Sequence, residues 1–509
     1  MLNTPDAPPS LAIAWTRAWR GDVLALFSGA LLPLAFSPFD ISIMALLAPA
    51  ALFFLWLQMS PRRALWRGLL FGLGMFGVGV TWIYISIYEF GGVSLPLSIF
   101  LMSLFVVVLA WFPALCGYFV TRCFTASTAL KLLLIFPAAW TLFEWIRGWF
   151  LTGFPWLYLG HSQIDMPLAG FAPVSGVYGV SWATAFSAGL VVMALLDTRG
   201  MLSKLRYIAV LAIIWITAGL LNMQQWTQPV GAPLKVSLIQ GNIAQDVKWT
   251  PDVLVPTLEL YLRLTREHWD SDLIVWPETA LPLFYHEAKP FVNGLEKEAR
   301  ENGADILFGL PVLNERTQRY YNSMMSVGSQ TAFYHKSHLV PFTEYLPLKN
   351  ILASVVDFLQ VPMSDFSKGD KDQRPLAVAG QKAAISICYE AVFGEEVIRQ
   401  LPEATLLVNV SNDAWFGGSI GPHQHLQITR MRALETGRPL LRTTNTGITA
   451  IVAPDGKLQA LAKQFEVQVL TGTIQPMSGA TPYVRIGNLP VVLILMLILG
   501  VAMLTKKPR

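Results

Sequence analysis

The sequence predicts two kinds of structure in one chain, a helical membrane domain and a soluble α/β domain. Hydrophobic residues make up 53% of the 509 residues and charged residues only 14%, against about 25% charged in average soluble chains. Residues 11–224 are almost continuously apolar, 226–485 have the composition of an ordinary soluble domain, and a last apolar run covers 489–504. We therefore expect a polytopic α-helical membrane domain joined to an α/β domain.

The apolar regions divide into eight expected membrane spans, because a spanning helix needs about 20 mostly apolar residues. Pro33, Pro38 and Pro49 interrupt the first two, which membrane helices tolerate where neighbours satisfy the freed backbone groups. The expected spans are 22–37, 40–58, 66–88, 94–121, 130–148, 168–196, 205–224 and 488–504. The expected units are a membrane domain at 1–224, a soluble domain at 225–487, and a last helix with its tail at 488–509.

The placement of charge between the spans predicts the orientation of the chain. Basic residues gather before the first span and in every second loop, at Arg17, Arg20, Arg62, Arg63, Arg67, Arg122, Lys131, Arg199, Lys204, Arg206, Lys506, Lys507 and Arg509. The intervening loops hold Asp40, Glu89 and Asp165 instead. Because basic loops stay in the cytoplasm, both termini are expected there. The soluble domain then lies outside, which in a bacterial inner membrane means the periplasm.

The soluble region alternates strand and helix patterns. Expected strands cover 234–240, 272–276, 305–310, 324–327, 383–387, 406–410 and two within 440–453. Expected helices cover 251–269, 287–302 and 424–435, the last two closed by Gly303 and Gly437. This alternation is typical of an α/β domain whose helices cover the sheet faces. Residues 361–375 are expected to form a polar surface loop.

One cysteine stands at the end of an expected strand, in Ile387-Cys388-Tyr389-Glu390. Cys388 is the only cysteine of the soluble region, since Cys116 and Cys123 belong to an apolar segment, so it has no partner there for a disulfide. A thiol held at a strand end can act as a nucleophile. A free cysteine can equally be a small buried hydrophobe.

A nucleophilic thiol needs a base, and other expected strands end on suitable residues. Glu278 follows the strand at 272–276, and the stretch 334–345 contains Lys336 and Glu344. A carboxylate can take the thiol proton, and a lysine can stabilise an oxyanion. The alternative is that these side chains are solvated surface residues.

Other functions find less support in the sequence. His335 with His338, or His423 with His425, could bind a metal, but no cysteine or carboxylate spacing completes a zinc pattern. We therefore expect no metal. The net charge of +4 is too small and dispersed to indicate nucleic-acid binding.

The expected fifth span ends in two features of its own. Glu144 and Arg147 are i, i+3 neighbours near its outer end, where a structural pair is more common than a functional one. The aromatic segment 149–156 follows, and we interpret it as an interfacial aromatic belt. A lipid-facing gate is the alternative.

Three segments, at Pro277-Glu278, His335-Lys336 and Ile387–Glu390, resemble the Glu-Lys-Cys triad of the nitrilase (carbon–nitrogen hydrolase) superfamily. Further matching segments follow in the superfamily's order, at 408–413, 432–435 and 444–447, and the resemblance covers about 230–475. With its membrane domain, the whole chain is similar to the bacterial apolipoprotein N-acyltransferases, a membrane-embedded family of that superfamily. This similarity includes the stretch 240–249, from Gln240-Gly241-Asn242 to Lys248-Trp249.

The resemblance implies an αββα sandwich on an eight-helix membrane base and a ping-pong acyl transfer. Cys388 would attack the sn-1 ester of a phospholipid, typically phosphatidylethanolamine. The acyl group would then pass to the α-amine of an S-diacylglyceryl cysteine at a lipoprotein N-terminus. Glu278 would be the general base and Lys336 the oxyanion stabiliser, and no cofactor would be needed.

The resemblance also assigns supporting roles. Glu344 would hold Lys336, and Tyr389 and Glu390 would shape the cleft around the thiol. Trp249 would lie at the mouth of the site on a loop that touches lipid, and Asn412, within a matched segment, would support the site.

Two other functions are compatible with parts of the sequence. A membrane-tethered amidase acting on a small amide would use the same triad, although eight spans would be a large anchor for such an enzyme. A transporter with an external binding domain would not need the thiol, and the spans lack convincing paired charges deep in the membrane.

Overall fold

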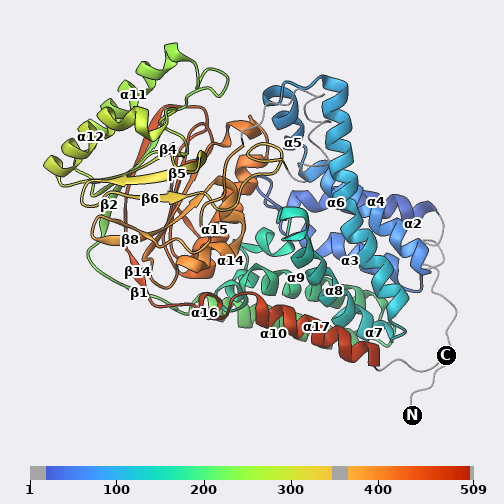
Figure 1. Cartoon of the computed structure of the whole chain (residues 1–509). Helices are drawn as coiled ribbons and strands as arrows, with labels where there is room; N and C mark the ends of the chain where they lie inside the picture. The colour runs from blue at the N-terminus through green and yellow to red at the C-terminus, as the bar shows by residue number, and fades with distance from the viewer. Residues whose placement is uncertain (1–18, 347–364, 505–509) are drawn as a thin grey trace.

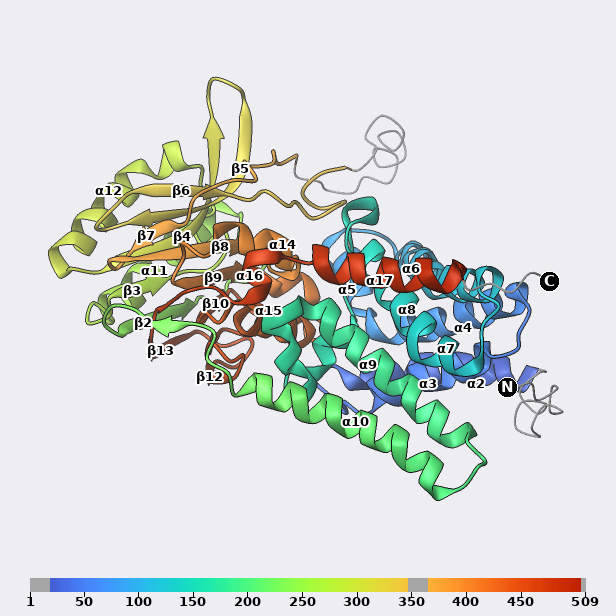
Figure 2. The ribbon, with the colours of Figure 1, turned by 90° about the horizontal axis from the view of Figure 1, so that it is seen from below.

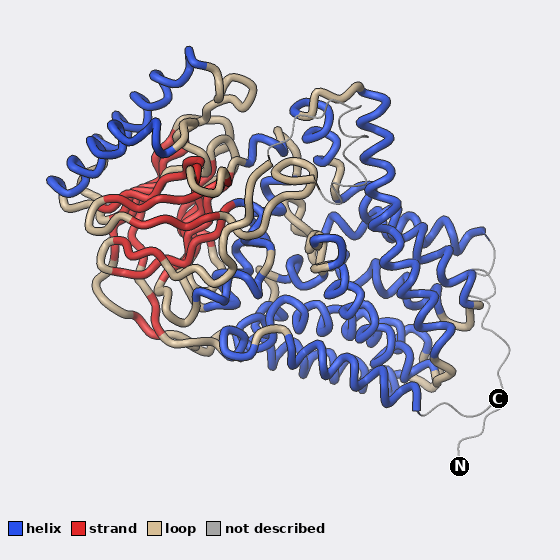
Figure 3. The backbone as a smooth tube through the Cα atoms, in the orientation of Figure 1, coloured by secondary structure: helices blue, strands red, loops and turns tan. Residues whose placement is uncertain are grey.

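The computed structural model describes residues 19–346 and 365–504. A helical region and a region built of two sheets lie side by side (Figures 1 and 3). Arg17, Lys506, Lys507 and Arg509, and residues 361–364 of the expected polar loop, lie outside the described residues.

Two six-stranded sheets form the α/β region. The first has the order β13-β2-β3-β4-β5-β6 and the second β12-β11-β10-β9-β8-β7. The strands of the first are β13 Gln468–Ile474, β2 Leu234–Gln240, β3 Leu273–Val275, β4 Asp305–Asn314, β5 Arg319–Val327 and β6 Ala332–His335. Those of the second are β12 Leu458–Leu461, β11 Ala450–Val452, β10 Leu440–Thr444, β9 Leu406–Ser411, β8 Gln381–Ile387 and β7 Leu376–Val378. A short ribbon pairs β1 Gln228–Pro229 with β14 Met477–Ser478.

Apolar side chains on alternate positions bury both faces of the central strands. Leu273 and Val275 of β3 point into the core between the sheets. Ile274 between them packs under the outer helices. Because successive side chains of a strand point to opposite faces, a continuous apolar run produces a strand buried on both sides. The central strands β2, β3 and β4 are parallel, as are β8, β9 and β10.

Helices cover the outer face of each sheet and complete an αββα sandwich. α11 Pro251–Arg266 and α12 Tyr285–Asn302 lie on the first sheet. The short α14 Gly394–Val397 and α15 Gly421–Thr436 lie on the second. The expected helix at 424–435 is therefore part of α15, which ends at Gly437 in the left-handed conformation, with φ 63°.

Within the described residues, four helices are long and apolar enough to cross a membrane. They are Leu95–Cys123 (α6), Thr128–Arg147 (α7 to α8), Pro167–Leu196 (η6 and α9) and Met201–Asn222 (α10). A fifth span is present if α4 Pro61–Gly79 and the following helical segment Trp82–Phe90, bent by 57°, count as one. Figure 2 shows α10 along the outer edge of the helical region.

The expected count of eight spans is therefore not reached by helix length. The remaining three expected spans correspond to α2 Trp19–Leu31, α3 Met44–Trp56 and α17 Leu489–Leu504, each of 16 residues or fewer. Pro33 lies in a 3-10 turn directly after α2. The first expected span therefore ends early, because proline has no N–H to continue the α-helical ladder.

The segment after α8 packs inward as well as outward. Trp149, Phe150 and Leu151 are exposed, but Trp156 is buried. Arg147 donates to the carbonyl oxygens of Phe154, at 3.0 Å, and of Trp156. Only the first half of the segment therefore has the exposure of an aromatic belt, and the second half is part of the protein core.

Glu144, the other charged residue near the end of α8, is also engaged in holding this segment. Its Oε1 accepts from the Leu159 N–H at 2.9 Å and from the Trp140 indole at 3.0 Å. Glu144 and Arg147 thus both bind main-chain groups of the segment that follows α8.

Candidate active site

The backbone at Cys388 is held in an unusual conformation at the end of β8. Its φ is +52°, in the left-handed region that non-glycine residues rarely adopt. Such conformations concentrate at functional sites, where the surrounding structure enforces them. Cys388 is partly exposed, so the strand end presents its side chain on a tight turn.

Glu278, just after β3, is buried and its carboxylate is fixed from several sides. Oε1 accepts from the Asn322 side chain at 2.7 Å and lies 3.4 Å from Lys336 Nζ. Oε2 accepts from the main-chain N–H of Asn412 at 2.8 Å. Since Asn412 follows β9 of the second sheet, this bond joins the two sheets at the site.

Lys336 follows β6 and lies between two carboxylates. Its Nζ is 2.9 Å from Glu344 Oε1 and 3.4 Å from Glu278 Oε1, and the side chain is 1% exposed. Burial alone would lower the pKa of Lys336, but the charges of Glu344 and Glu278 raise it above its ordinary value. The lysine is therefore a buried, fully charged cation.

The electrostatics at Cys388 favour the neutral thiol. Burial, reinforced by the charge of Glu278, raises the pKa of the thiol to about 12, while Lys336 acts in the opposite direction. A neutral thiol is a poor nucleophile. A reaction of this thiol as a nucleophile would therefore need a base, and Glu278 is a carboxylate of the same cluster.

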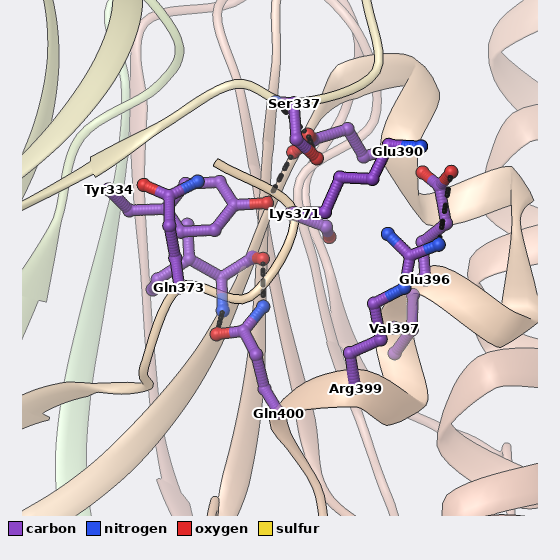
Figure 4. A pocket seen from close by; sticks show the side chains of 11 residues that line it. Tyr334, Ser337, Lys371, Gln373, Glu390, Glu396, Val397, Arg399 and Gln400 are labelled. Atoms are coloured by element: carbon purple, nitrogen blue, oxygen red, sulfur yellow. Dashed lines mark hydrogen bonds and ion pairs between the residues drawn. The ribbon is translucent and has the colours of Figure 1, made fainter. Parts of the chain in front are cut away.

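Glu390 is buried and binds main-chain groups on both sides of the site. Oε1 accepts from the N–H groups of Ser337 and His338 at 2.6 and 3.1 Å, and Oε2 accepts from the Ile387 N–H at 2.8 Å. Figure 4 shows it among the residues of a small cavity that also includes Tyr334, whose hydroxyl donates to Oε2 at 3.1 Å. Glu390 thus joins the turn of Lys336 to the turn of Cys388.

Tyr389 connects the site to the membrane domain. Its hydroxyl donates to the Gly153 carbonyl at 2.8 Å, and its ring stacks on Trp156 with centroids 6.3 Å apart. His338 makes a second connection, with Nε2 3.1 Å from the Thr152 carbonyl. The segment after α8 therefore lies against the turn that carries Cys388.

Asn412 and Trp249 occupy different places at the site. The Asn412 side chain donates to Gln245 Oε1 at 2.6 Å and accepts from Asn445 at 3.2 Å, so it holds the loop before α11. Trp249 lies on that loop and is 55% exposed. Its place at the mouth of the site stays a prediction.

Two residues that the sequence reasoning did not single out complete the cluster. Asn322, on β5, donates to both Glu278 and Glu344, at 2.7 and 3.1 Å. Lys248 is buried beside Trp249 and its Nζ donates to the Glu278 carbonyl at 3.3 Å, while burial lowers its pKa to about 8. Lys248 lies in the stretch 240–249 that resembles the family, which is the signal that could have found it.

The histidines considered as metal ligands have other partners. His335 Nδ1 lies 2.7 Å from the Ser323 hydroxyl, and His338 Nδ1 lies 3.0 Å from Glu396. In the part of the chain that the structure describes, no three His, Cys, Asp or Glu residues are arranged to hold a metal ion.

The fold and the site define a carbon–nitrogen hydrolase domain built onto a membrane domain. The carbon–nitrogen hydrolase family model matches residues 235–483, and the model of the apolipoprotein N-acyltransferase N-terminal domain matches 28–190. The chain belongs to the apolipoprotein N-acyltransferase family. It is accordingly an acyltransferase of lipoprotein maturation in the nitrilase superfamily.

Relatives similar over nearly the whole chain carry this assignment. The apolipoprotein N-acyltransferase of Methylococcus capsulatus is 49% identical over 474 residues, covering 92% of this chain and 93% of its own. That of Azotobacter vinelandii is 44% identical over 494 residues, covering 96% of each. A solved carbon–nitrogen hydrolase from Helicobacter pylori G27 is similar over 48% of this chain and 90% of its own, with 15% identity and a TM-score of 0.37.

Proposed function

We propose that this chain acylates lipoproteins through a thioester on Cys388, with Glu278 as general base and Lys336 as oxyanion stabiliser. The observation that carries the proposal is one buried cluster. In it, the carboxylate of Glu278 and the ammonium of Lys336 lie 3.4 Å apart beside a thiol whose pKa both charges influence. Each of the three residues follows a strand, and the strands come from both sheets.

In the first half-reaction the Glu278 carboxylate takes the thiol proton while sulfur attacks the sn-1 ester carbonyl of a phospholipid. The tetrahedral oxyanion forms beside the Lys336 ammonium, which is charged before the substrate arrives and needs no reorganisation. Collapse breaks the ester C–O bond. Glu278 returns the proton to the leaving alkoxide, so a lysophospholipid departs and a thioester remains.

In the second half-reaction the α-amine of an S-diacylglyceryl cysteine attacks the thioester carbonyl. Glu278 now takes a proton from the amine, and the oxyanion again forms beside Lys336. Collapse breaks the C–S bond and the sulfur recovers a proton, which leaves an amide on the lipoprotein and a neutral thiol. The pKa of about 12 at Cys388 favours this neutral end state.

The supporting residues have roles that their contacts favour. Glu344 binds Lys336 at 2.9 Å and thereby fixes the position of the ammonium. Glu390 acts through the main chain, by holding the turns of Lys336 and Cys388 together. Tyr389 forms part of an aromatic wall with Trp156, and such a wall helps to keep water from the thioester. Trp249 and Asn412 belong to the mouth of the site and the loop that borders it.

The donor and the placement of the site are further parts of the proposal. Both substrates are amphiphiles, so the site has to lie near the bilayer, and the contact of Tyr389 with Gly153 favours that position. Phosphatidylethanolamine, implied by the family resemblance, is the donor that we propose. A lipoprotein acceptor and a phospholipid donor in general follow from the family.

We also propose an inner-membrane location with the domain at 225–487 in the periplasm and both termini in the cytoplasm. The domain at 1–224 would supply seven spans and the segment at 488–509 the eighth. The connection from α9 to α10, which is basic, lies at the end of the helical region farthest from the sheets (Figure 2), as this orientation requires. In this arrangement α2, α3 and α17 would each be one of the eight spans, although each is shorter than the about 20 residues of a typical spanning helix.

Mass spectrometry of Cys388 after incubation with phosphatidylethanolamine tests donor and nucleophile together. The purified protein should gain one acyl group on the peptide that contains Cys388, and an acceptor lipopeptide should remove it. Cys388→Ser should give a folded protein without thioester, whereas Cys123→Ser, at a half-buried membrane-domain thiol, should behave as wild type. An acyl group on another residue, or full turnover by Cys388→Ser, would contradict the proposal.

The membrane-tethered amidase remains the rival that uses the same triad. It predicts rapid hydrolysis of small soluble amides and no accumulation of acyl-enzyme with phospholipid. Supplying both substrate classes to one preparation distinguishes the two functions.

A further inference from the structure

The turn that presents Cys388 is held from behind by two side-chain donors. The Cys388 carbonyl oxygen lies 3.3 Å from Nε2 of His425, on α15, and 3.5 Å from Nδ2 of Asn409, on β9. The left-handed conformation is unfavourable for a non-glycine residue and persists only where neighbouring groups enforce it. These two contacts fix the peptide that follows the nucleophile.

The partners of His425 determine which of its ring nitrogens carries the proton. Arg442 Nη2 lies 3.0 Å from His425 Nδ1. Arginine is always a donor, so Nδ1 accepts and the proton resides on Nε2, which faces the Cys388 carbonyl. The Asp413 carboxylate also lies 3.3 Å from Nδ1, but it is held by its ion pair with Arg442 at 2.7 Å, and the Arg442 contact is the shorter of the two at Nδ1. Burial and Arg442 both lower the pKa of His425, which keeps the ring neutral.

The helix that carries His425 also binds the membrane domain. Gln424 Oε1 accepts from the indole N–H groups of Trp82, at 3.2 Å, and Trp156, at 2.9 Å. The Trp156 ring contacts His425, with centroids 5.8 Å apart, and also stacks on Tyr389. Adjacent residues of α15 thus bind the membrane domain and the turn of the nucleophile.

We propose that His425 is a positioning residue, which donates its Nε2–H to the Cys388 carbonyl and so holds the nucleophile's turn in register with the membrane domain. The inference rests on the proposed function, because it assumes that Cys388 is the acylated residue. His425 moves no proton in this role. Its contribution is the Nε2–H group, which binds the Cys388 carbonyl.

Two substitutions of similar size distinguish the effect of the hydrogen-bond donor from the effect of filling the space that the His425 side chain occupies. The amide nitrogen of His425→Gln can occupy the place of Nε2, whereas that of His425→Asn falls short of the carbonyl. Because His425→Asn removes one hydrogen bond to the turn, we expect it to slow acylation of Cys388 about tenfold. We expect His425→Gln to stay within about twofold of wild type.

The experiment measures single-turnover acylation of Cys388 with phosphatidylethanolamine, the KM for that lipid, the apparent Tm and the dependence of the rate on pH. The expected pattern is a lower acylation rate for His425→Asn at unchanged KM, recovery in His425→Gln, and the same pH profile in wild type and His425→Gln. His423→Asn, on the same helix, is the matched control and should acylate at the wild-type rate. His425→Met, which fills the space without a donor, replaces the Asn variant if that variant does not fold.

Three results would overturn the inference. The first is wild-type acylation by folded His425→Asn or His425→Met. The second is an equal loss in the Gln and Asn variants with equally lowered Tm, which would mean a role in stability alone. The third is a pH profile that loses one limb in His425→Gln, which would mean proton transfer. Acylation that persists in Cys388→Ser would instead contradict the proposed function itself.

Discussion

The helices on the two outer faces of the sandwich differ in what surrounds them. α11 and α12 bury one face each, at positions such as Tyr261 and Leu264, and turn their charged residues to water. α15 is buried along its length except at His423, although it contains five charged or amide side chains, Gln424, Gln427, Arg430, Arg432 and Glu435. The first pair of helices protects a sheet from solvent, whereas α15 lies between a sheet and the membrane domain.

The polar residues of α15 bind partners that are distant in the sequence. Arg430 pairs with Asp165 at 3.0 Å, and Glu435 accepts from the Val177 N–H at 2.8 Å. Gln427 donates to Asp40 at 3.3 Å. The same charge types on α11 and α12 form exposed pairs, such as that of Arg263 with Glu267 one turn further on. Polar residues on a helix can therefore indicate an interface with another part of the protein as well as a face exposed to water.

The residues of the site are also divided between the two sheets. Glu278, Lys336 and Glu344 come from the first sheet and its loops, and Cys388 comes from the second, whose outer helix binds the membrane domain. Changes on the first side should therefore alter the chemistry. Changes on the second side should alter how the thiol and the membrane domain are held together.

Glu278→Gln should have the largest effect and should separate the chemistry from the reactivity of the thiol. Acylation of Cys388 should fall at least about a thousandfold, because the proton of the neutral thiol has no acceptor. The charge of Glu278 raises the pKa of the thiol, so its removal lowers that pKa. Alkylation of Cys388 by iodoacetamide at pH 8, followed by peptide mass spectrometry, should therefore become faster. Slower alkylation in this variant would contradict the described electrostatics.

Glu344→Gln should have an intermediate effect. The variant keeps an acceptor for Lys336 but loses a charge that raises the pKa of the lysine. Acylation should fall about tenfold to a hundredfold. The loss of activity at alkaline pH should begin at a lower pH than in wild type, because the lysine now deprotonates more easily.

A pH–rate profile of the Glu344→Gln variant measures this shift. Glu315→Gln, on an exposed turn, is the matched control and should leave both rate and profile unchanged. An alkaline limb at the wild-type position would mean that Glu344 does not hold Lys336 in its charged form.

Gln424→Leu tests the membrane side of the comparison directly. It leaves the indole N–H groups of Trp82 and Trp156 buried without an acceptor, and an unsatisfied buried donor costs about 1–3 kcal/mol. The apparent Tm should fall by about 5 °C. Arg266→Ala removes an exposed ion pair with Glu298 on α12 and should lower the Tm by less than about 2 °C. Equal shifts for the two variants would remove the distinction between α15 and α11.

We expect the smallest effect from Glu435, whose titration should make the stability of the protein depend on pH. Burial raises the pKa of Glu435 from an ordinary value of 4.5 to about 7. The neutral form is therefore favoured in the folded protein, and its stabilising contribution is complete below pH 4.5 and is lost as the pH rises to 7. Between pH 5 and 7.5 the Tm of wild type should fall relative to that of Glu435→Gln by about 2 °C. Parallel Tm curves for the two proteins would contradict this.

The sequence predicted those residues of the cluster that directly follow a strand. Cys388 and Glu278 could be found because apolar runs end directly before them. Asn322 and His425 could not be found in this way. Asn322 lies within a strand and His425 within a helix, so only the pairing of β5 with its neighbours and the packing of α15 give them their roles.

The membrane spans show that composition alone does not predict the course of a helix. An apolar run predicts that a segment avoids water, but it does not predict where the helix breaks. The run that contains α9 is broken at Gly176, with φ 64°, where Glu435 binds the next N–H group. The run at 66–88 is bent by 57° between Gly79 and Trp82, and its apolar composition does not predict that bend.

The sequence by itself determined the division into an apolar helical part and an α/β part, and it determined the strand ends that carry Glu278 and Cys388. It did so because burial and backbone period are local properties of a segment. The tertiary structure decided which sheet each of these residues comes from and which buried polar group each carboxylate binds. It also decided that α15 lies between the site and the membrane domain, because a buried polar side chain is satisfied by whichever partner the fold brings near, however distant in the sequence.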